Sequence, residues 1–314
     1  MAEIWTMGEM LCEIMRPEVG MELYEKGLFY GPYPSGAPAI FIDTVARLGH
    51  SAGIIGGVGK DDFGKCLLER LEKDGVDISH VIQTAGESTG VAFVTYFVDG
   101  SRKYIFHFSD SPATKAKAPM NAKTLGKVEY FHVMGCSLMA SAEFGAEIVK
   151  TMHLMRGIGA KISFDPNIRV ELLGDKKCME LVEEVMRACS VFEPGVAELL
   201  MITGEDSVET AVEKCFKNPI LEVITLKNGS KGCTVYTREH VECFGVYPTV
   251  VKDATGAGDC FDGAFLCGLI EGKSTEESAK MASAAASLNT AAFGPMEGAI
   301  SRETIAQKMS EKIL

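Results

Sequence analysis

The second half of the chain alternates between short apolar runs and segments with helical spacing. The strand-like runs cover 131–135, 161–165, 190–194, 222–226 and 233–236, and the helical segments between them cover 142–156, 179–188 and 208–216. Strands that are joined through helices pair in parallel, so this pattern predicts a doubly wound, mostly parallel sheet. Binding and catalytic residues of such sheets lie at the carboxyl ends of the strands. Asp165 falls at one such end, where it is either a site residue or a helix cap.

The first half of the chain contains a different pattern. Residues 91–108 alternate apolar and polar side chains around Asp99-Gly100, which is typical of a β-hairpin. Residues 23–33 are rich in Gly, Tyr and Phe and favour short exposed strands. Because helical crossovers cannot reach these segments, we expect them to form a second, smaller sheet.

A glycine-rich turn at 256–258 precedes a run with helical spacing, in which Phe261, Phe265 and Leu269 share one face. Unpaired amide groups at such a helix start, together with the helix dipole, favour binding of an anion. Asp259 either caps this helix or faces the anion pocket as a proton acceptor.

Composition excludes several classes of protein. The net charge of −12 argues against nucleic acid or an anionic membrane surface as a partner. No apolar run approaches the roughly 18 residues that span a bilayer. The ten cysteines contain no C-x-x-C pair, so we expect reduced thiols in a cytoplasmic protein, and neither cysteine nor histidine spacing indicates a transition-metal site. Neither a P-loop nor a G-x-G-x-x-G dinucleotide fingerprint is present.

The stretch 253–259 (D-A-T-G-A-G-D), followed by Phe261, Gly263 and Phe265, resembles the C-terminal signature of the ribokinase-like (PfkB) carbohydrate kinases. The resemblance extends from Gly8 to about Gly298. It implies one kinase domain over 1–314: a doubly wound α/β sheet with helices on both faces and a small β-sheet lid, inserted at about 9–35 and 89–112. In this family the final Asp is the catalytic base and the turn binds the transferring phosphoryl group. The resemblance therefore implies Asp259 as the base and Gly256, Ala257 and Gly258 as the anion hole.

Other segments match the family in part. The resemblance implies sugar contacts from Glu13, Gly36, Ala37 and Arg169. It implies ATP contacts from Asn167, Lys227, Gly229, Ser283 and Asn289, and a Mg²⁺ contact, through water, from Glu198. A solvated Glu13 and tight helix packing at Ser283 are the structural alternatives. The chain departs from the family pattern at three positions: Ser35 replaces a Gly, and Ile40 and Gly195 each replace an Asn.

We therefore expect an ATP- and Mg²⁺-dependent sugar kinase, with K⁺ as a further candidate cofactor. A ketohexose such as fructose or tagatose is the first candidate acceptor, 2-keto-3-deoxygluconate the second, and ribose or a nucleoside the third. The alternative from another class is a sugar sensor that binds without turnover. A homodimer through the lid is expected, because a small uncovered sheet exposes edges and an apolar face.

Overall fold

The computed structural model describes residues 3–169 and 176–314, and within these its main sheet has nine strands. Their order across the sheet is β13 (Val241–Phe244), β12 (Cys233–Thr237), β11 (Val223–Lys227), β10 (Val191–Phe192), β9 (Lys161–Asp165), β8 (Tyr130–Met134), β1 (Ile4–Met7), β4 (Ala52–Gly59) and β5 (Val76–Thr84). All neighbours pair in parallel except along β11–β12 and β12–β13, which are antiparallel. The mostly parallel, doubly wound sheet that the alternating pattern predicts is confirmed.

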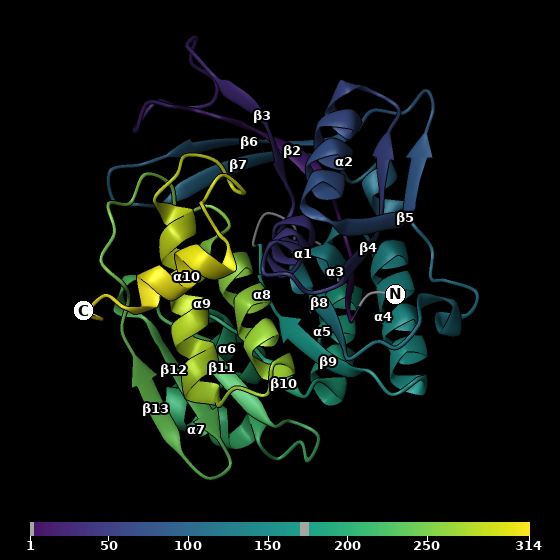
Figure 1. Cartoon of the computed structure of the whole chain (residues 1–314). Helices are drawn as coiled ribbons and strands as arrows, with labels where there is room; N and C mark the ends of the chain where they lie inside the picture. The colour runs from purple at the N-terminus through teal and green to yellow at the C-terminus, as the bar shows by residue number, and fades with distance from the viewer. Residues whose placement is uncertain (1–2, 170–175) are drawn as a thin grey trace.

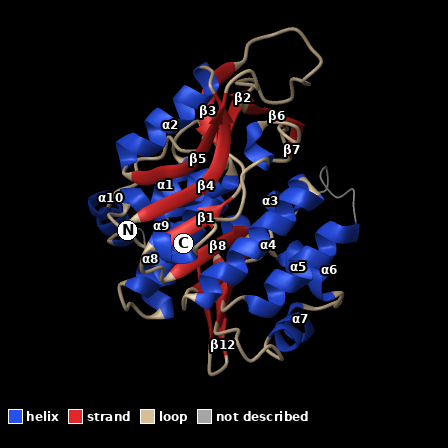
Figure 2. Cartoon of the chain, turned by 90° about the vertical axis from the view of Figure 1, so that its right-hand side faces the viewer, coloured by secondary structure: helices blue, strands red, loops and turns tan. Residues whose placement is uncertain are grey.

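Helices cover both faces of this sheet (Figures 1 and 2). On one face lie α1 (Ala37–Arg47), α2 (Asp62–Asp74), α8 (Ala257–Ile270), α9 (Thr275–Thr290) and α10 (Arg302–Met309). On the other lie α3 (Gly135–Ala140), α4 (Ala142–Gly157), α5 (Lys176–Ala188), α6 (Val196–Thr203) and α7 (Val208–Cys215). No helix among the described residues is long and apolar enough to cross a bilayer.

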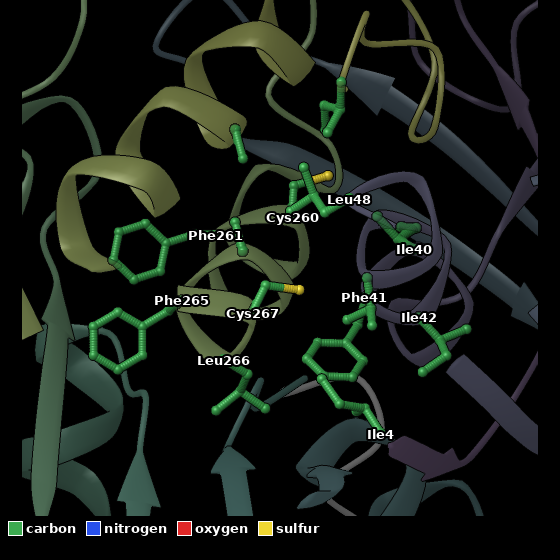
Figure 3. Close-up of a cluster of buried hydrophobic side chains, with 14 of the residues drawn as sticks. Ile4, Ile40, Phe41, Ile42, Leu48, Cys260, Phe261, Phe265, Leu266 and Cys267 are labelled. Carbon is green, nitrogen blue, oxygen red and sulfur yellow. The ribbon is translucent and has the colours of Figure 1, made fainter. Parts of the chain in front are cut away.

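Each face of the sheet has its own hydrophobic core. Figure 3 shows part of the first, where Phe41 of α1 and Leu266 of α8 lie among buried side chains of both helices. Thr44 of α1 donates a hydrogen bond to the thiol of Cys260 in α8, at 3.3 Å. Because α8 is packed along its whole length, its N-terminal end is held firmly at the edge of the sheet where the parallel strands finish.

A separate four-stranded sheet, called the lid sheet below, has the order β3 (Tyr30–Ser35), β2 (Leu11–Met15), β6 (Gly90–Tyr96) and β7 (Arg102–His107). In Figure 1 these strands lie together in the upper part of the view. The hairpin expected over 91–108 is confirmed as β6 and β7, which pair antiparallel. All four strands fall within 9–35 and 89–112.

The expectation of short strands over 23–33 is only partly correct. The segment before Tyr30 is a loop that coils around the side chain of Arg16. This guanidinium is fully buried, donates to the backbone carbonyls of Glu22, Glu25 and Leu28, and lies 3.8 Å from the ring centre of Phe29. These carbonyls accept from a side chain instead of pairing in a sheet, which the apolar pattern alone does not reveal.

Candidate active site

The N-terminus of α8 is the centre of the site. Gly256 is the residue before the helix and has a φ of 78°, and a Cβ atom there would lie 2.6 Å from the carbonyl oxygen of Pro295. Only glycine fits this position without strain. The helix begins at Ala257, so Asp259 lies in its first turn, at the positive end of the helix dipole.

The backbone amides of this turn are largely free. The amide of Ala257 donates to the carbonyl of Ala254 at 3.3 Å, and that of Cys260 donates to Gly256 at 2.9 Å. Within the described residues, the amides of Gly256, Gly258 and Asp259 have no protein acceptor. Three donors with no protein acceptor at a helix N-terminus form an anion-binding site. Of the three predicted amides, Gly256 and Gly258 are free, Ala257 is already used, and Asp259 supplies the third.

Two cavities meet at this turn. The first, called the acceptor cavity below, has a volume of about 220 Å³ and lies between the lid sheet and the turn. The second, called the donor cavity below, has a volume of about 540 Å³ and lies between the turn and α9. Asp259 lines the acceptor cavity and Ala257 the donor cavity. Gly258, Lys227 and Ala254 line both cavities, so they form the shared wall.

The predicted sugar-binding residues lie together in the acceptor cavity. Glu13, Gly36, Ala37 and Arg169 all line it. The carboxyl of Glu13 is buried and accepts a hydrogen bond from Ser35 at 2.7 Å. Burial raises its pKa to about 7, although the Ser35 hydrogen bond opposes this shift. Glu13 is therefore not the solvated glutamate of the alternative interpretation.

The predicted nucleotide-binding residues divide between several places. Gly229 and Ser283 line the donor cavity. Asn167 lines the acceptor cavity instead, where its side-chain amide donates a hydrogen bond to Oδ1 of Asp259 at 3.2 Å. Asn289 lines neither cavity. It is fully buried behind the turn and donates to the carbonyl of Thr255 at 2.8 Å, so it supports the backbone that leads into the anion site.

The carboxyl of Asp259 is buried and has an unusual pKa. Burial raises this pKa to about 7, the charge on Asp165 adds to the increase, and Arg169 and Lys227 oppose it. Its partner Asn167 has a φ of 38°, a left-handed conformation that asparagine tolerates better than most residues. The amide of Asn167 is thereby held against the carboxyl that faces the cavity. A carboxyl that titrates near neutral pH is suited to accept a proton from a bound hydroxyl.

Lys227 ends β11 at the shared wall of the two cavities. Its ammonium lies 2.8 Å from Oδ2 of Asp165 and 2.9 Å from both carboxylate oxygens of Asp262. Burial lowers the pKa of Lys227, but these carboxylates raise it above its ordinary value. Burial raises the pKa of Asp165, but Lys227 lowers it below its ordinary value. A Cβ atom on Gly258 would lie 3.7 Å from the Lys227 nitrogen. A fixed positive charge therefore lies beside the anion-binding turn.

Glu198 lies at the start of α6 and lines the acceptor cavity. One carboxylate oxygen accepts from the amide of Ile168 and the other from the amide of Gly195, both at 2.7 Å. No group of three or more potential His, Cys, Asp or Glu ligands occurs in the part of the chain that the structure describes. The Glu198 carboxylate, held by two backbone amides, is an oxygen donor of the kind that Mg²⁺ takes.

Two features of the acceptor cavity were not predicted as site residues. Glu9 is buried there, with Cys136 donating to one oxygen at 3.2 Å and Ser137 donating to the other. A wall of Tyr104, Phe106 and Phe108 also lines it. The period-two alternation of the lid hairpin places these three aromatic residues on one face, so that pattern contains the missing signal.

Two cavities that share an anion-binding wall, with a buried carboxyl in one of them, define the active site of a two-substrate phosphotransferase. The sequence profile of the pfkB family of carbohydrate kinases matches residues 2–302. The chain belongs to this family of kinases.

Similar proteins agree with this assignment. Fructokinase-1 of Oryza sativa subsp. japonica is 31% identical over 298 residues, which cover 92% of each chain. Fructokinase-1 of Zea mays is 30% identical over the same length, again with 92% of each chain covered. A crystal structure of an E. coli protein provisionally named Ribokinase II, in complex with ATP and Mg²⁺, is 34% identical and has a TM-score of 0.92, covering 98% of this chain and 99% of that one. The small lid sheet, the main sheet and the helices on both faces therefore form a ribokinase-like fold.

Proposed function

We propose that the protein transfers the γ-phosphoryl group of ATP to a hydroxyl of a ketohexose such as fructose. The observation that supports this proposal most strongly is the wall that the two cavities share. The buried carboxyl of Asp259 faces the acceptor cavity, and Gly258 of the same turn faces both cavities. The plant fructokinases support fructose as the first acceptor to test. Residues 1–314 form a single kinase domain in this proposal, and the lid is inserted into it at 9–35 and 89–112.

In the proposed reaction, the acceptor hydroxyl lies between Asp259 and the γ-phosphorus. As the oxygen attacks phosphorus, its proton passes to the carboxylate of Asp259 and the bond to the β-phosphate oxygen breaks. The free amides of Gly256, Gly258 and Asp259 and the ammonium of Lys227 stabilise the charge on the moving phosphoryl group. Gly229 and Ser283 contact the nucleotide. Glu198 would hold a Mg²⁺ ion through water, and this ion would supply further neutralisation of the phosphate charge.

A panel of acceptors tests this function. ADP release is measured with the purified chain and MgATP over fructose, tagatose, 2-keto-3-deoxygluconate, ribose and a nucleoside. We expect the highest kcat/KM with a ketohexose. Saturable sugar binding without ADP release would instead identify a sugar sensor. Repeating the assay with K⁺ replaced by a bulky organic cation tests the predicted potassium dependence.

One observation favours a sugar acid as the second candidate acceptor. Arg102 and Arg169 both line the acceptor cavity, and guanidinium groups bind carboxylates in a bidentate geometry. Higher kcat/KM with 2-keto-3-deoxygluconate than with fructose, lost in Arg102→Gln or Arg169→Gln, would select this acceptor over the ketohexose.

The raised pKa of Asp259 predicts a pH dependence. Below about pH 7 the carboxyl is protonated and cannot accept the hydroxyl proton, so kcat/KM should rise about tenfold per pH unit under pH 6 and level off above pH 8. Glu13 has a similar pKa, so Glu13→Gln is the control: it should lower affinity for the sugar and keep the same profile. A profile that becomes flat in Glu13→Gln would assign the titration to Glu13 instead.

We also propose a homodimer that forms through the lid sheet. The outer side of the lid has a hollow of about 850 Å³ whose lining includes Ile14, Val91 and Phe93. Ile105 of the edge strand β7 is 43% exposed. A second copy covers this apolar surface and the free strand edge. We expect a dimer mass in solution for the natural chain and a monomer mass for Ile105→Lys; a monomeric natural chain removes the proposal.

A cytoplasmic location is proposed with this function. None of the ten cysteines, all of which lie in the described residues, forms a disulfide, and nine of them are buried or partly buried, as expected for a chain in a reducing compartment.

A further inference from the structure

Two side chains of the lid hairpin end on the residue that precedes the anion-binding turn. The hydroxyl of Tyr96, the last residue of β6, lies 3.0 Å from Oγ1 of Thr255. Arg102, the first residue of β7, donates to the same oxygen at 3.4 Å. Thr255 is bonded directly to Gly256, whose left-handed conformation begins the turn. The lid and the turn are therefore joined by side chains, of which Arg102 and Thr255 line the acceptor cavity and Tyr96 lines neither the acceptor cavity nor the donor cavity.

Asp253 extends this connection into the core. Its Oδ1 accepts from the hydroxyl of Tyr96 at 3.0 Å and from the amide of Thr255 at 2.9 Å. Its Oδ2 accepts from the amide of Gly294 at 3.0 Å. Asp253 is 3% exposed, so these hydrogen bonds are shielded from water. The Tyr96 hydroxyl therefore contacts both the Asp253 carboxylate and the Thr255 hydroxyl, and these two residues shape the backbone that enters the turn.

The ring of Tyr96 has a separate role in packing. It lies 6.4 Å from the ring of Phe293, measured between centroids. Tyr33, on the lid strand β3, packs on the same phenylalanine at 5.9 Å. Within the described residues, the hydroxyl of Tyr33 has no hydrogen bond to the protein. The two tyrosines therefore share an aromatic contact and differ in whether the hydroxyl reaches the turn.

We propose that Tyr96 is a positioning residue that couples closure of the lid over the acceptor to the geometry of the anion-binding turn. When the lid is closed, its hydroxyl fixes the Thr255 side chain directly and the Thr255 amide by way of Asp253. The amides of Gly256 and Gly258 then point at the phosphoryl group. Without the hydroxyl the lid still packs on Phe293, and the turn is less well held. Because these amides act on charge that develops in the transition state, the loss falls on kcat.

The inference rests on the proposed phosphoryl transfer, which turnover of the natural chain establishes first. In Tyr96→Phe we expect kcat to fall about ten- to a hundredfold, the effect of the two buried hydrogen bonds of the hydroxyl, with KM for ATP changed less than about twofold. Tyr33→Phe is the matched control and should keep the natural kcat. The thermal midpoint of both variants is measured, since a similar midpoint separates positioning from a loss of folded protein.

A double-mutant cycle decides whether Tyr96 acts through Thr255. Thr255→Val should lower kcat, Thr255→Ser should keep the natural rate, and the double variant with Tyr96→Phe should lose less than the product of the two single losses. Losses that multiply in the double variant, a kcat of Tyr96→Phe equal to that of Tyr33→Phe, or a loss confined to KM for the sugar would each overturn the proposal. An inactive natural chain would instead refute the proposed function.

Discussion

Replacing Asp259 with Asn should lower kcat by about 10²–10⁴, because an amide cannot take the proton of the sugar hydroxyl. ATP binding should be unchanged, because the amide keeps the shape of the side chain. The carboxyl is buried in the acceptor cavity and contacts Asn167, so the substitution disturbs few other groups. Steady-state kinetics with the best acceptor measure kcat, and titration with a fluorescent ATP analogue measures the affinity.

The controls for this result separate the chemistry from the fold. Asp206→Asn, at an exposed position outside both cavities, should behave as the natural chain. The remaining activity of Asp259→Asn should also lose the rise with pH that is centred near 7. If Asp259→Asn turned over a confirmed sugar at the natural rate, another group would have to be the base.

The second large effect is expected for Lys227→Met. This change leaves the carboxylates of Asp165 and Asp262 buried without their cation. Removing one partner of a buried ion pair costs about 3–5 kcal/mol in the free energy of unfolding. The same change removes a positive charge from the shared wall, so kcat should fall by about 10²–10³. Urea unfolding and steady-state kinetics measure the two losses separately.

A second substitution separates the two roles of Lys227. Asp262 is fully buried and lines neither cavity, so Lys227→Met combined with Asp262→Asn should recover part of the stability and none of the activity. Lys227→Arg retains the charge and should keep more stability than Lys227→Met, although its flat guanidinium does not reproduce the contacts of an ammonium. Equal stability of Lys227→Met and the natural chain would show that the ion pair contributes nothing.

The main sheet could be predicted because its signal is local. Runs such as 161–165 are short and apolar, and the helices between them have their own spacing, so the elements and the mostly parallel sheet follow from the pattern. The motif at 253–259 likewise combines its functional groups in seven consecutive residues. The loop before Tyr30 could not be predicted, because its shape depends on a buried Arg16 that binds backbone carbonyls several residues away.

Contacts between distant segments explain why other parts of the site could not be predicted from the sequence. Asn167 contacts Asp259 across 92 residues, and Tyr96 contacts Asp253 across 157 residues. No periodicity in either segment indicates these pairs. Asn289 was predicted to contact ATP, and its small neighbours do lie near the donor cavity, but its own side chain turns toward Thr255. Side-chain direction at such positions is decided by tertiary packing, which one sequence does not contain.

The walls of the two cavities have separate origins. Tyr104, Phe106 and Phe108 belong to the lid hairpin or the residue after it and line the acceptor cavity, whereas no described residue of the lid lines the donor cavity. Exchanging these three rings for smaller or polar groups would therefore redirect the enzyme toward other alcohols while its use of ATP stays intact. An engineer could exchange these three rings and keep Tyr96 and Arg102, which connect the hairpin to the anion-binding turn.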